Sequence, residues 1–105
     1  MRWEATSQDV IDHIVFSGAD TYDWYVDLHV DGEMIVCAME DPDDSESVIT
    51  NQISAASLRL SVDNYVLNQR SGFSYVERAI KDDDFDCYDA DIVLQWWLLG
   101  EVVYG

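Results

Sequence analysis

Basic residues are scarce in this sequence of 105 amino acids. Five Lys and Arg side chains accompany 22 Asp and Glu, which gives a net charge of −17. Such a chain repels phosphate, so we expect no direct binding to DNA, RNA or anionic lipid. The same charge destabilises the compact state by self-repulsion. We consider three properties that would offset this cost: a basic partner that normally holds nucleic acid, a high-salt cytoplasm, or bound cations.

Long apolar runs are also missing. The longest apolar stretch, residues 92–104, is interrupted by Gln95, Gly100 and Glu101. A membrane span needs about 20 apolar residues, so no transmembrane segment is expected. Residues 1–4 lack the basic and apolar regions of a secretory signal. The sequence therefore predicts a soluble, intracellular protein.

Cysteine and histidine are too few and too dispersed for a zinc site. Cys37 and Cys87 lie 50 residues apart without a CxxC motif, and His13 and His29 are isolated from them. Structural zinc needs clustered Cys or His. We expect two reduced thiols and no metal, while a disulfide stays open as the alternative.

Motifs for catalysis and calcium binding are likewise absent from the sequence. An EF-hand loop needs Gly at its sixth position and Glu at its twelfth. A loop counted from Asp82 has Cys87 and Val93 there, and one counted from Asp41 has Gln52 at the twelfth position. No phosphate-binding loop, dinucleotide turn or nucleophile elbow occurs. We therefore expect a protein without cofactor or enzymatic activity.

Apolar side chains, in contrast, are plentiful. They form 49% of the chain, aromatic residues form 12%, and four residues are Trp. Acidic disordered tails have few aromatic residues, so this composition indicates a folded protein. The length fits one domain, and we predict a single acidic α+β domain over residues 1–105.

The N-terminal half predicts a helix followed by a hairpin. Thr6 is a typical cap for a helix over residues 7–17, which Gly18 ends. Residues 22–30 then alternate with period two, placing Trp24, Val26, Leu28 and Val30 on one face and Asp23, Tyr25, Asp27 and His29 on the other. A turn at Asp31-Gly32 predicts a return strand over 33–39, with Leu28 opposite Ile35 and Val26 opposite Cys37.

The C-terminal half predicts mainly helices. Residues 40–46 read as an acidic loop and 47–49 as a short third strand. A second helix is expected from Thr50 or Asn51 to about Leu67, although alternation at 58–62 also allows a strand. A short helix over 73–81 and a last helix over 89–99 follow. The predicted fold is α+β: a helix, a hairpin with a possible third strand, then two or three helices packed on the sheet.

The acids themselves are the candidate binding surface. Carboxylates at positions i and i+2 of one strand face lie about 6–7 Å apart, close to the spacing of neighbouring phosphates. Acids so spaced can occupy the Arg/Lys channel of a basic nucleic-acid-binding protein. The candidate contact residues lie in the first strand and in two acidic loops: Asp23, Asp27, Asp43, Asp44, Asp82, Asp83, Asp84 and Asp86.

Two adjacent tryptophans in the last helix allow two interpretations. This helix is apolar nearly all round, which is typical of a buried helix or of one that presents a face to a partner. Trp96 and Trp97 are therefore either core residues or an apolar anchor for a partner or a second copy, since Trp is favoured at interface hot spots.

The C-terminal stretch, residues 89–105, reads DADIVLQWWLLGEVVYG. It resembles the C-terminus of a group of small tailed-phage proteins without established activity, which end in D-A-D-x-x-x-Q-x-x-x-[FL]-G-E-[VI]-x-Y-G. The segment Val10 to Ile14 and the aromatic Tyr22 to Tyr25 are similar to that group's opening helix and strand. The chain departs from the group at Trp96-Trp97.

The resemblance implies a phage setting, hence a protein acting in the host-cell cytoplasm. Small acidic phage proteins often block host restriction or CRISPR machinery by occupying its nucleic-acid site, an argument by association. The resulting hypothesis is a non-enzymatic DNA or RNA mimic. Its rivals are a salt-adapted or virion structural protein whose acids serve solvation only, and a small regulator of a host polymerase or repressor.

Overall fold

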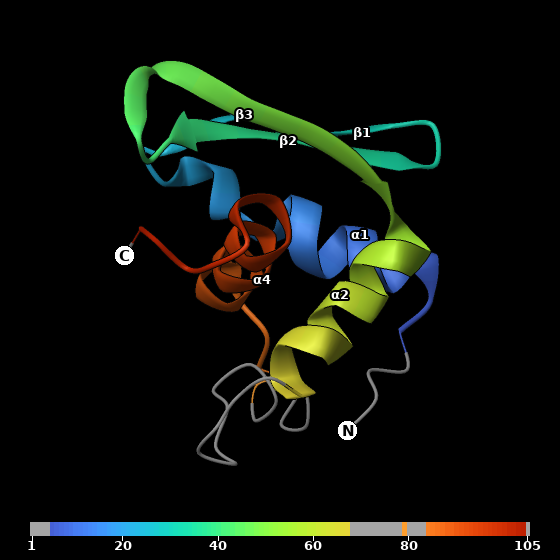
Figure 1. The fold of residues 1–105 in the computed structure, drawn as a ribbon. Coiled ribbons are helices and arrows are strands. Elements are labelled where there is room, and N and C mark those ends of the chain that lie inside the picture. The colour runs from blue at the N-terminus through green and yellow to red at the C-terminus, as the bar shows by residue number, and fades with distance from the viewer. Residues whose placement is uncertain (1–4, 68–78, 80–83, 105) are drawn as a thin grey trace.

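The chain folds into two layers, a three-stranded antiparallel sheet and a set of helices packed on one of its faces (Figure 1). This computed structural model describes residues 5–67, 79 and 84–104. The α+β class predicted from the sequence is confirmed. The elements are α1 (Ser7–Ile14), η1 (Val15–Ser17), η2 (Ala19–Thr21), β1 (Tyr25–Asp31), β2 (Met34–Asp41), β3 (Asp44–Ser54), α2 (Ala55–Leu67) and α4 (Cys87–Leu99).

The first helix begins with a capping box. The Thr6 hydroxyl accepts the backbone N–H of Asp9 at 3.1 Å, and the Asp9 carboxylate accepts the N–H of Thr6 at 3.0 Å. These two bonds satisfy N–H groups that a helix start leaves without partners. The helix predicted over 7–17 is α-helical to Ile14 and continues as the short 3₁₀ turn η1. Gly18 then reverses the chain at φ +93°, a left-handed conformation that favours glycine.

The β1–β2 hairpin turns one residue later than predicted. The turn residues are Gly32 and Glu33, and Gly32 has φ +61°. Primed hairpin turns need positive φ at their first central residue, so the glycine occupies that position instead of the second. Leu28 consequently pairs with Cys37, and the predicted pairing of Leu28 with Ile35 is wrong. Because the register differs by two residues, the predicted apolar face is nevertheless preserved.

A β-bulge reverses two other orientations. Tyr25 pairs with Met39 and Asp27 with Ala38, so Val26 is the extra residue between them. Val26 is 57% exposed, while Tyr25 packs against the core, the opposite of the prediction for both. A bulge changes the strict alternation of a strand locally, and a period-two pattern does not reveal its position.

The third strand is much longer than predicted. Residues 40–46 form the ends of β2 and β3 around a two-residue turn at Pro42-Asp43, and β3 extends over the 50–54 segment expected to be helical. Ile49 and Ile53 face Met39 and Ile35 across the ladder, so this segment continues the alternation of the sheet. Helix α2 begins only after Ser54, whose hydroxyl accepts the N–H of Ser57 at 3.2 Å.

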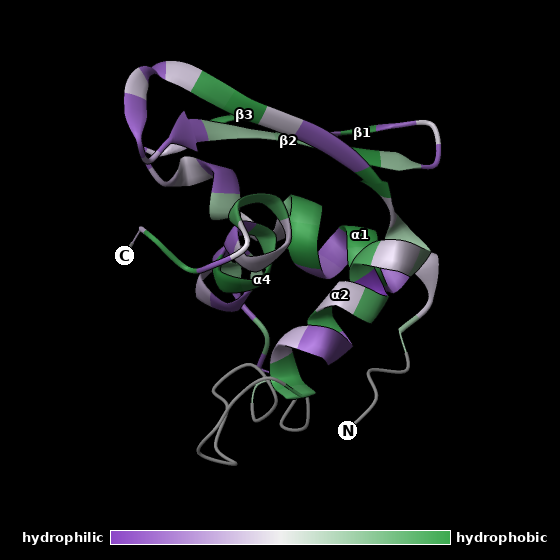
Figure 2. Cartoon of the chain, viewed as in Figure 1, coloured by the Kyte–Doolittle hydropathy of each residue, from purple (hydrophilic) through white to green (hydrophobic). Residues whose placement is uncertain are grey.

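The core lies between the inner face of the sheet and the helices. Figure 2 shows hydrophobic residues where α1, α2 and α4 meet below the sheet. The sheet contributes Leu28, Ile35, Cys37 and Met39, and the helices contribute Val10, Ile14, Leu58, Val62, Val93 and Leu94, all buried. The helix predicted over 73–81 lies outside the described residues except for Ala79, which is buried.

The last helix begins two residues before its predicted start, because Asp86 is the cap. The Asp86 carboxylate accepts the N–H groups of Tyr88 and Asp89, and the Asp89 carboxylate accepts the N–H of Asp86 at 3.1 Å. The helix ends at Gly100, which has φ +81°. Asp91 lies further along this helix, and its carboxylate is buried against the segment before β1.

Candidate functional site

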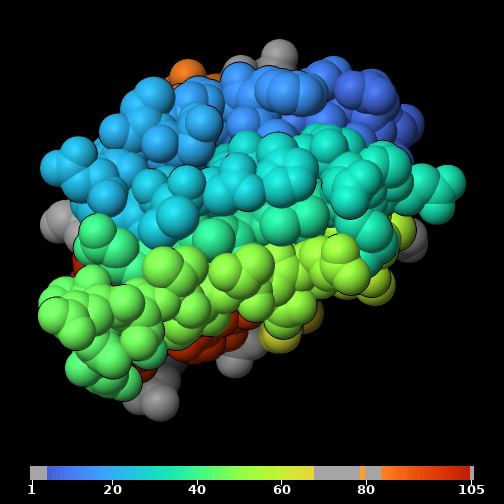
Figure 3. All heavy atoms as spheres, turned by 90° about the horizontal axis from the view of Figure 1, so that it is seen from above, coloured from blue at the N-terminus to red at the C-terminus, as the bar shows by residue number. Residues whose placement is uncertain are grey.

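The outer face of the sheet is an open surface that carries candidate acids. Figure 3 looks onto it from above, and no described helix covers the three strands. Asp27 and His29 lie on this face as predicted, and Asp31 follows them at the next alternate position of β1. Asp23 was predicted on the same face, but it lies in the turn before β1. Beside them β2 contributes Met34, Val36 and Ala38, so this face is acidic along one edge and apolar along its centre.

One candidate acid on this face is paired. The Asp27 carboxylate lies 2.7 Å from Nδ1 of His29, and both side chains are about half exposed. Exposed pairs of this kind stabilise a fold by less than about 1 kcal/mol. The pair therefore orients Asp27 on the surface without removing it from contact with a partner.

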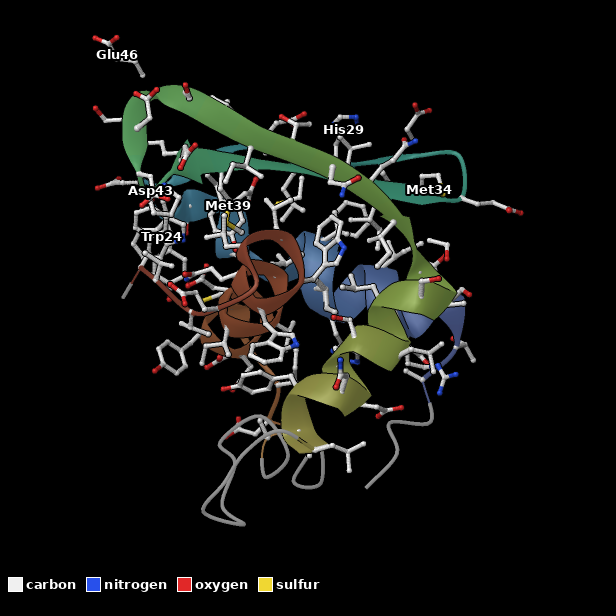
Figure 4. The ribbon with its side chains drawn as sticks, in the orientation of Figure 1. Trp24, His29, Met34, Met39, Asp43 and Glu46 are labelled. Carbon is white, nitrogen blue, oxygen red and sulfur yellow. The ribbon has the colours of Figure 1, made fainter. Side chains whose placement is uncertain are left out.

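The β2–β3 turn concentrates a second group of acids. Asp43 and Asp44 are exposed there, and Glu46 points away from the helices (Figure 4). The Asp44 carboxylate accepts the Glu46 N–H at 3.1 Å and the Ser47 hydroxyl at 2.8 Å. These bonds lower the pKa of Asp44, so it stays charged. Asp43 offers its side chain to solvent alone, whereas Asp44 also holds the turn together.

Asp23 lies at the same end of the molecule as this turn. It is exposed in the turn before β1, and the carbonyl of its neighbour Trp24 accepts the N–H of Glu40 at 3.0 Å. Figure 4 shows Trp24 and Asp43 close to one another at this end of the sheet. The structure thus brings Asp23, Asp43 and Asp44 together, while Asp27 lies further along the outer face.

The remaining candidates lie before α4. Asp84 and Asp86 are exposed, and Asp82 and Asp83 lie outside the described residues. Asp86 is the N-cap of α4 and is therefore partly a structural residue. Burial raises the pKa of Tyr22, the neighbour of Asp23, and the charge of Asp86 adds to this effect.

Trp96 and Trp97 are partly buried. The ring of Tyr65 packs edge-on against Trp96 with 5.5 Å between centroids and 72° between planes, and Trp97 packs against the core. Neither ring is fully enclosed or fully exposed. Both contribute to folding, and the anchor function stays a prediction.

Sequence reasoning missed the most highly connected acid of the described residues. Asp91 is 4% exposed, and its carboxylate accepts Nε1 of Trp24 at 2.8 Å, the hydroxyl of Tyr25 at 2.7 Å and Nε2 of Gln95 at 3.0 Å. Burial raises the pKa of Tyr25, and its hydrogen bond to Asp91 raises it further. The Tyr25 hydroxyl therefore keeps its proton and donates it to Asp91. The three donors bring together β1 with its preceding turn and α4.

Gln95 extends this network to the C-terminal tail. It is fully buried, its Oε1 accepts the N–H groups of Val103 and Tyr104, and its Nε2 donates to the Tyr104 carbonyl at 3.1 Å. The Tyr104 hydroxyl donates to the Glu40 carbonyl at 2.8 Å. Asp91, Gln95 and Tyr104 therefore form one hydrogen-bonded unit. Their polar side chains in an otherwise apolar C-terminal stretch were the available sequence signal for this unit.

No group of three or more His, Cys, Asp or Glu within the described residues has the geometry of a metal site. The described part of the chain also contains no helix of the length and apolarity that a membrane span requires. Cys37 and Cys87 are free thiols, and burial raises the pKa of Cys37 to about 12, so that thiol is unreactive at neutral pH.

Comparisons with protein-family models, with curated proteins and with solved structures found no significant match to this chain. The fold and the surface define a small two-layer α+β protein with an acidic, uncovered sheet face.

Proposed function

We propose that this protein is a phage-type acidic inhibitor that acts as a DNA or RNA mimic in the cytoplasm of a host cell. Its target would be a basic nucleic-acid-binding defence protein, of the restriction or CRISPR type. The observation that carries the proposal is the exposure of the candidate acids at the β2–β3 turn and on the adjoining sheet face.

Basic side chains within the described part of the chain leave the charge of these acids largely uncompensated. Apart from Asp27, which pairs with His29, the described candidate acids contact no basic side chain of the described residues. These unpaired carboxylates are available to Arg and Lys side chains of a partner, and their charge accelerates association of the two proteins. The rim charges of Asp23 and Asp43 have no hydrogen bond to the fold through their side chains, which is consistent with a role outside it.

Asp44 stabilises the β2–β3 turn and Asp86 caps α4, so neither needs a partner to explain it. Both suit the rival view that the acids serve folding and solvation. A salt-adapted or virion protein would need high salt to screen its charge. Thermal melts in low and in molar salt separate the two views. A mimic is folded in low salt, whereas a salt-adapted chain unfolds there.

Capture from a bacterial lysate tests the proposal. The tagged protein is expected to retain one nuclease, CRISPR complex or other nucleic-acid-binding machine at low salt. Duplex DNA or structured RNA should compete for it, and moderate salt should release it. Recovery of a partner that nucleic acid does not displace would contradict mimicry and would favour the regulator of a polymerase or repressor.

Two triple variants of equal charge locate the contact surface. The variant Asp23→Lys, Asp27→Lys, Asp43→Lys changes acids that do not hold the fold, and should abolish capture. The matched variant Asp12→Lys, Glu33→Lys, Glu101→Lys changes exposed acids elsewhere by the same charge and should retain it. Equal losses in both would show that net charge, and not a defined surface, causes binding.

A further inference from the structure

An aromatic pocket lies beside the acidic end of the sheet. Its volume is about 390 Å³, within the usual range of small-ligand sites. The segment before β1, the two helices α2 and α4, and the C-terminal tail all contribute to its lining. The rings and the carboxylate in this lining belong to Tyr22, Trp24, Tyr65, Tyr88, Asp91 and Tyr104.

Three of these rings are parallel to one another. Trp24 stacks with Tyr22 at 4.8 Å between centroids and 7° between planes, and with Tyr104 at 5.3 Å and 6°. Hydrogen bonds fix the middle ring and one outer ring of this stack, because Trp24 donates to Asp91 and Tyr104 donates to Glu40. A flat cation binds well to such an array, since it stacks on aromatic faces and is attracted by their negative potential.

Among the residues that the structure describes, the carboxylate in the wall has no cationic partner. Asp91 accepts three hydrogen bonds, all from neutral donors, and contacts no basic side chain of the described residues. A carboxylate has about four acceptor positions, so one remains. Because a buried negative charge is costly without a positive partner, an entering cation would gain an interaction that the fold does not supply.

Other acids make both ends of the pocket negative. Partial burial and contact with Cys87 raise the pKa of Tyr22, and the charges of Asp91 and Asp86 raise it further. At the other end, partial burial and the charge of Glu40 raise the pKa of Tyr104. Apolar walls with this potential favour a cation that sheds its water easily.

We infer that this pocket binds a guanidinium group, which stacks on the aromatic rings and pairs with Asp91. The group belongs either to a free small molecule or to an arginine side chain of a protein partner. An ammonium group is more strongly hydrated and is not planar, and a neutral ligand would leave the charge of Asp91 unpaired. The inference stands without the proposed function, and it deepens that function if a basic partner supplies the arginine.

Methylguanidinium is the probe, and methylurea is its neutral isostere. We expect methylguanidinium to bind with Kd on the order of 1–10 mM, as suits so small a ligand. Binding is followed by NMR through the Nε1–H resonance of Trp24, which donates to Asp91. Sodium chloride keeps the ionic strength constant during the titration. Equal binding of methylurea, or no saturable shift with methylguanidinium, would overturn the inference.

A tethered competitor tests the location without disturbing the core. Val102 lines the pocket from the tail and is 44% exposed, whereas the adjacent Val103 is 41% exposed and does not line it. The variant Val102→Lys should weaken methylguanidinium binding at least tenfold by occupying the pocket. The matched Val103→Lys should retain binding, and equal effects of the two would contradict the assigned site.

A short capped arginine peptide and its citrulline counterpart distinguish the two possible sources of the guanidinium group. Binding of the arginine peptide, but not of the citrulline peptide, would assign the pocket to a polypeptide partner. Binding of methylguanidinium alone would assign it to a small molecule. The acidic sheet face also attracts arginine, so the arginine peptide is tested on Val102→Lys and on Asp23→Lys, Asp27→Lys, Asp43→Lys. Loss of peptide binding in the first of these variants only assigns the peptide to the pocket, whether or not the protein mimics nucleic acid.

Discussion

The aspartates of the sheet and those of α4 have the same side chain but different structural roles. Asp27 and Asp43 lie on the surface, where solvent screens their charge. Asp89 and Asp91 are 5% and 4% exposed, and each is held by hydrogen bonds to N–H or O–H donors. The comparison teaches that net charge overstates the binding surface, because some of the acids are internal parts of the fold.

The largest expected difference concerns Asp91 and Asp27. Replacing Asp91 by Ala leaves the donors of Trp24, Tyr25 and Gln95 buried without an acceptor, so we expect a loss of about 3–5 kcal/mol. Asp27→Ala should change stability by less than about 0.5 kcal/mol, because its one partner is exposed. Urea unfolding measures both free energies, and equal values would contradict the division of the acids.

Gln95 should be next in effect. Gln95→Ala removes a fully buried side chain that holds the tail, and we expect a loss of about 2–4 kcal/mol. Hydrogen exchange at the amides of Val103 and Tyr104 should become much faster, because both donate to Gln95. Unchanged protection of these two amides would show that something else retains the tail.

The two capping boxes predict opposite pH dependences. Burial raises the pKa of Asp89 from 3.8 to about 6, whereas the N–H of Thr6 lowers the pKa of Asp9. Between pH 4 and 6 the folded state therefore binds more protons at Asp89 than the unfolded state, and stability falls as pH rises. Asp9 contributes in the other sense, since its stabilisation is lost as pH falls below its unfolded pKa.

Thermal melts of Asp89→Asn and Asp9→Asn across this range separate the two. Asn still accepts the N–H of residue 86 or 6, so each cap is retained. Asp89→Asn should flatten the fall in stability between pH 4 and 6, and Asp9→Asn should lower stability at neutral pH. A steeper fall in Asp89→Asn would contradict the raised pKa.

The smallest expected effect is that of a single surface charge. Asp43→Lys removes repulsion at the β2–β3 turn and should raise stability by less than about 0.5 kcal/mol at low salt. Added salt should reduce this difference, because it screens the charges of both proteins. A loss of stability that salt does not change would indicate a structural role for Asp43 that its exposure does not show.

The sequence predicted what depends on local pattern. The Thr6 start, the Gly18 and Gly100 ends and the inward face of Leu28 all follow from caps, turns and periodicity. Residues 50–54 became strand because they pair with β2, a long-range interaction that local propensity does not contain. The bulge at Val26 likewise depends on the register with Met39 and Ala38.

The candidate site was predictable in type and not in arrangement. Exposure of Asp23, Asp27, Asp43 and Asp44 agrees with the acidic surface expected from composition. The burial of Asp91 was not predictable, because two of its donors, Trp24 and Tyr25, are 67 and 66 residues away in the chain. The aromatic pocket depends on the same long-range contacts, because Tyr22 and Tyr104 lie near opposite ends of the chain.

Displacement of nucleic acid from the purified partner tests the central claim most directly. Fluorescence anisotropy of a labelled DNA or RNA on that partner reports whether the protein competes for the site. The account predicts full displacement by the wild-type protein and by Asp12→Lys, Glu33→Lys, Glu101→Lys. It predicts none by Asp23→Lys, Asp27→Lys, Asp43→Lys, which should fold with wild-type stability. Displacement by this last variant at wild-type concentration would contradict the claim that these acids imitate phosphates.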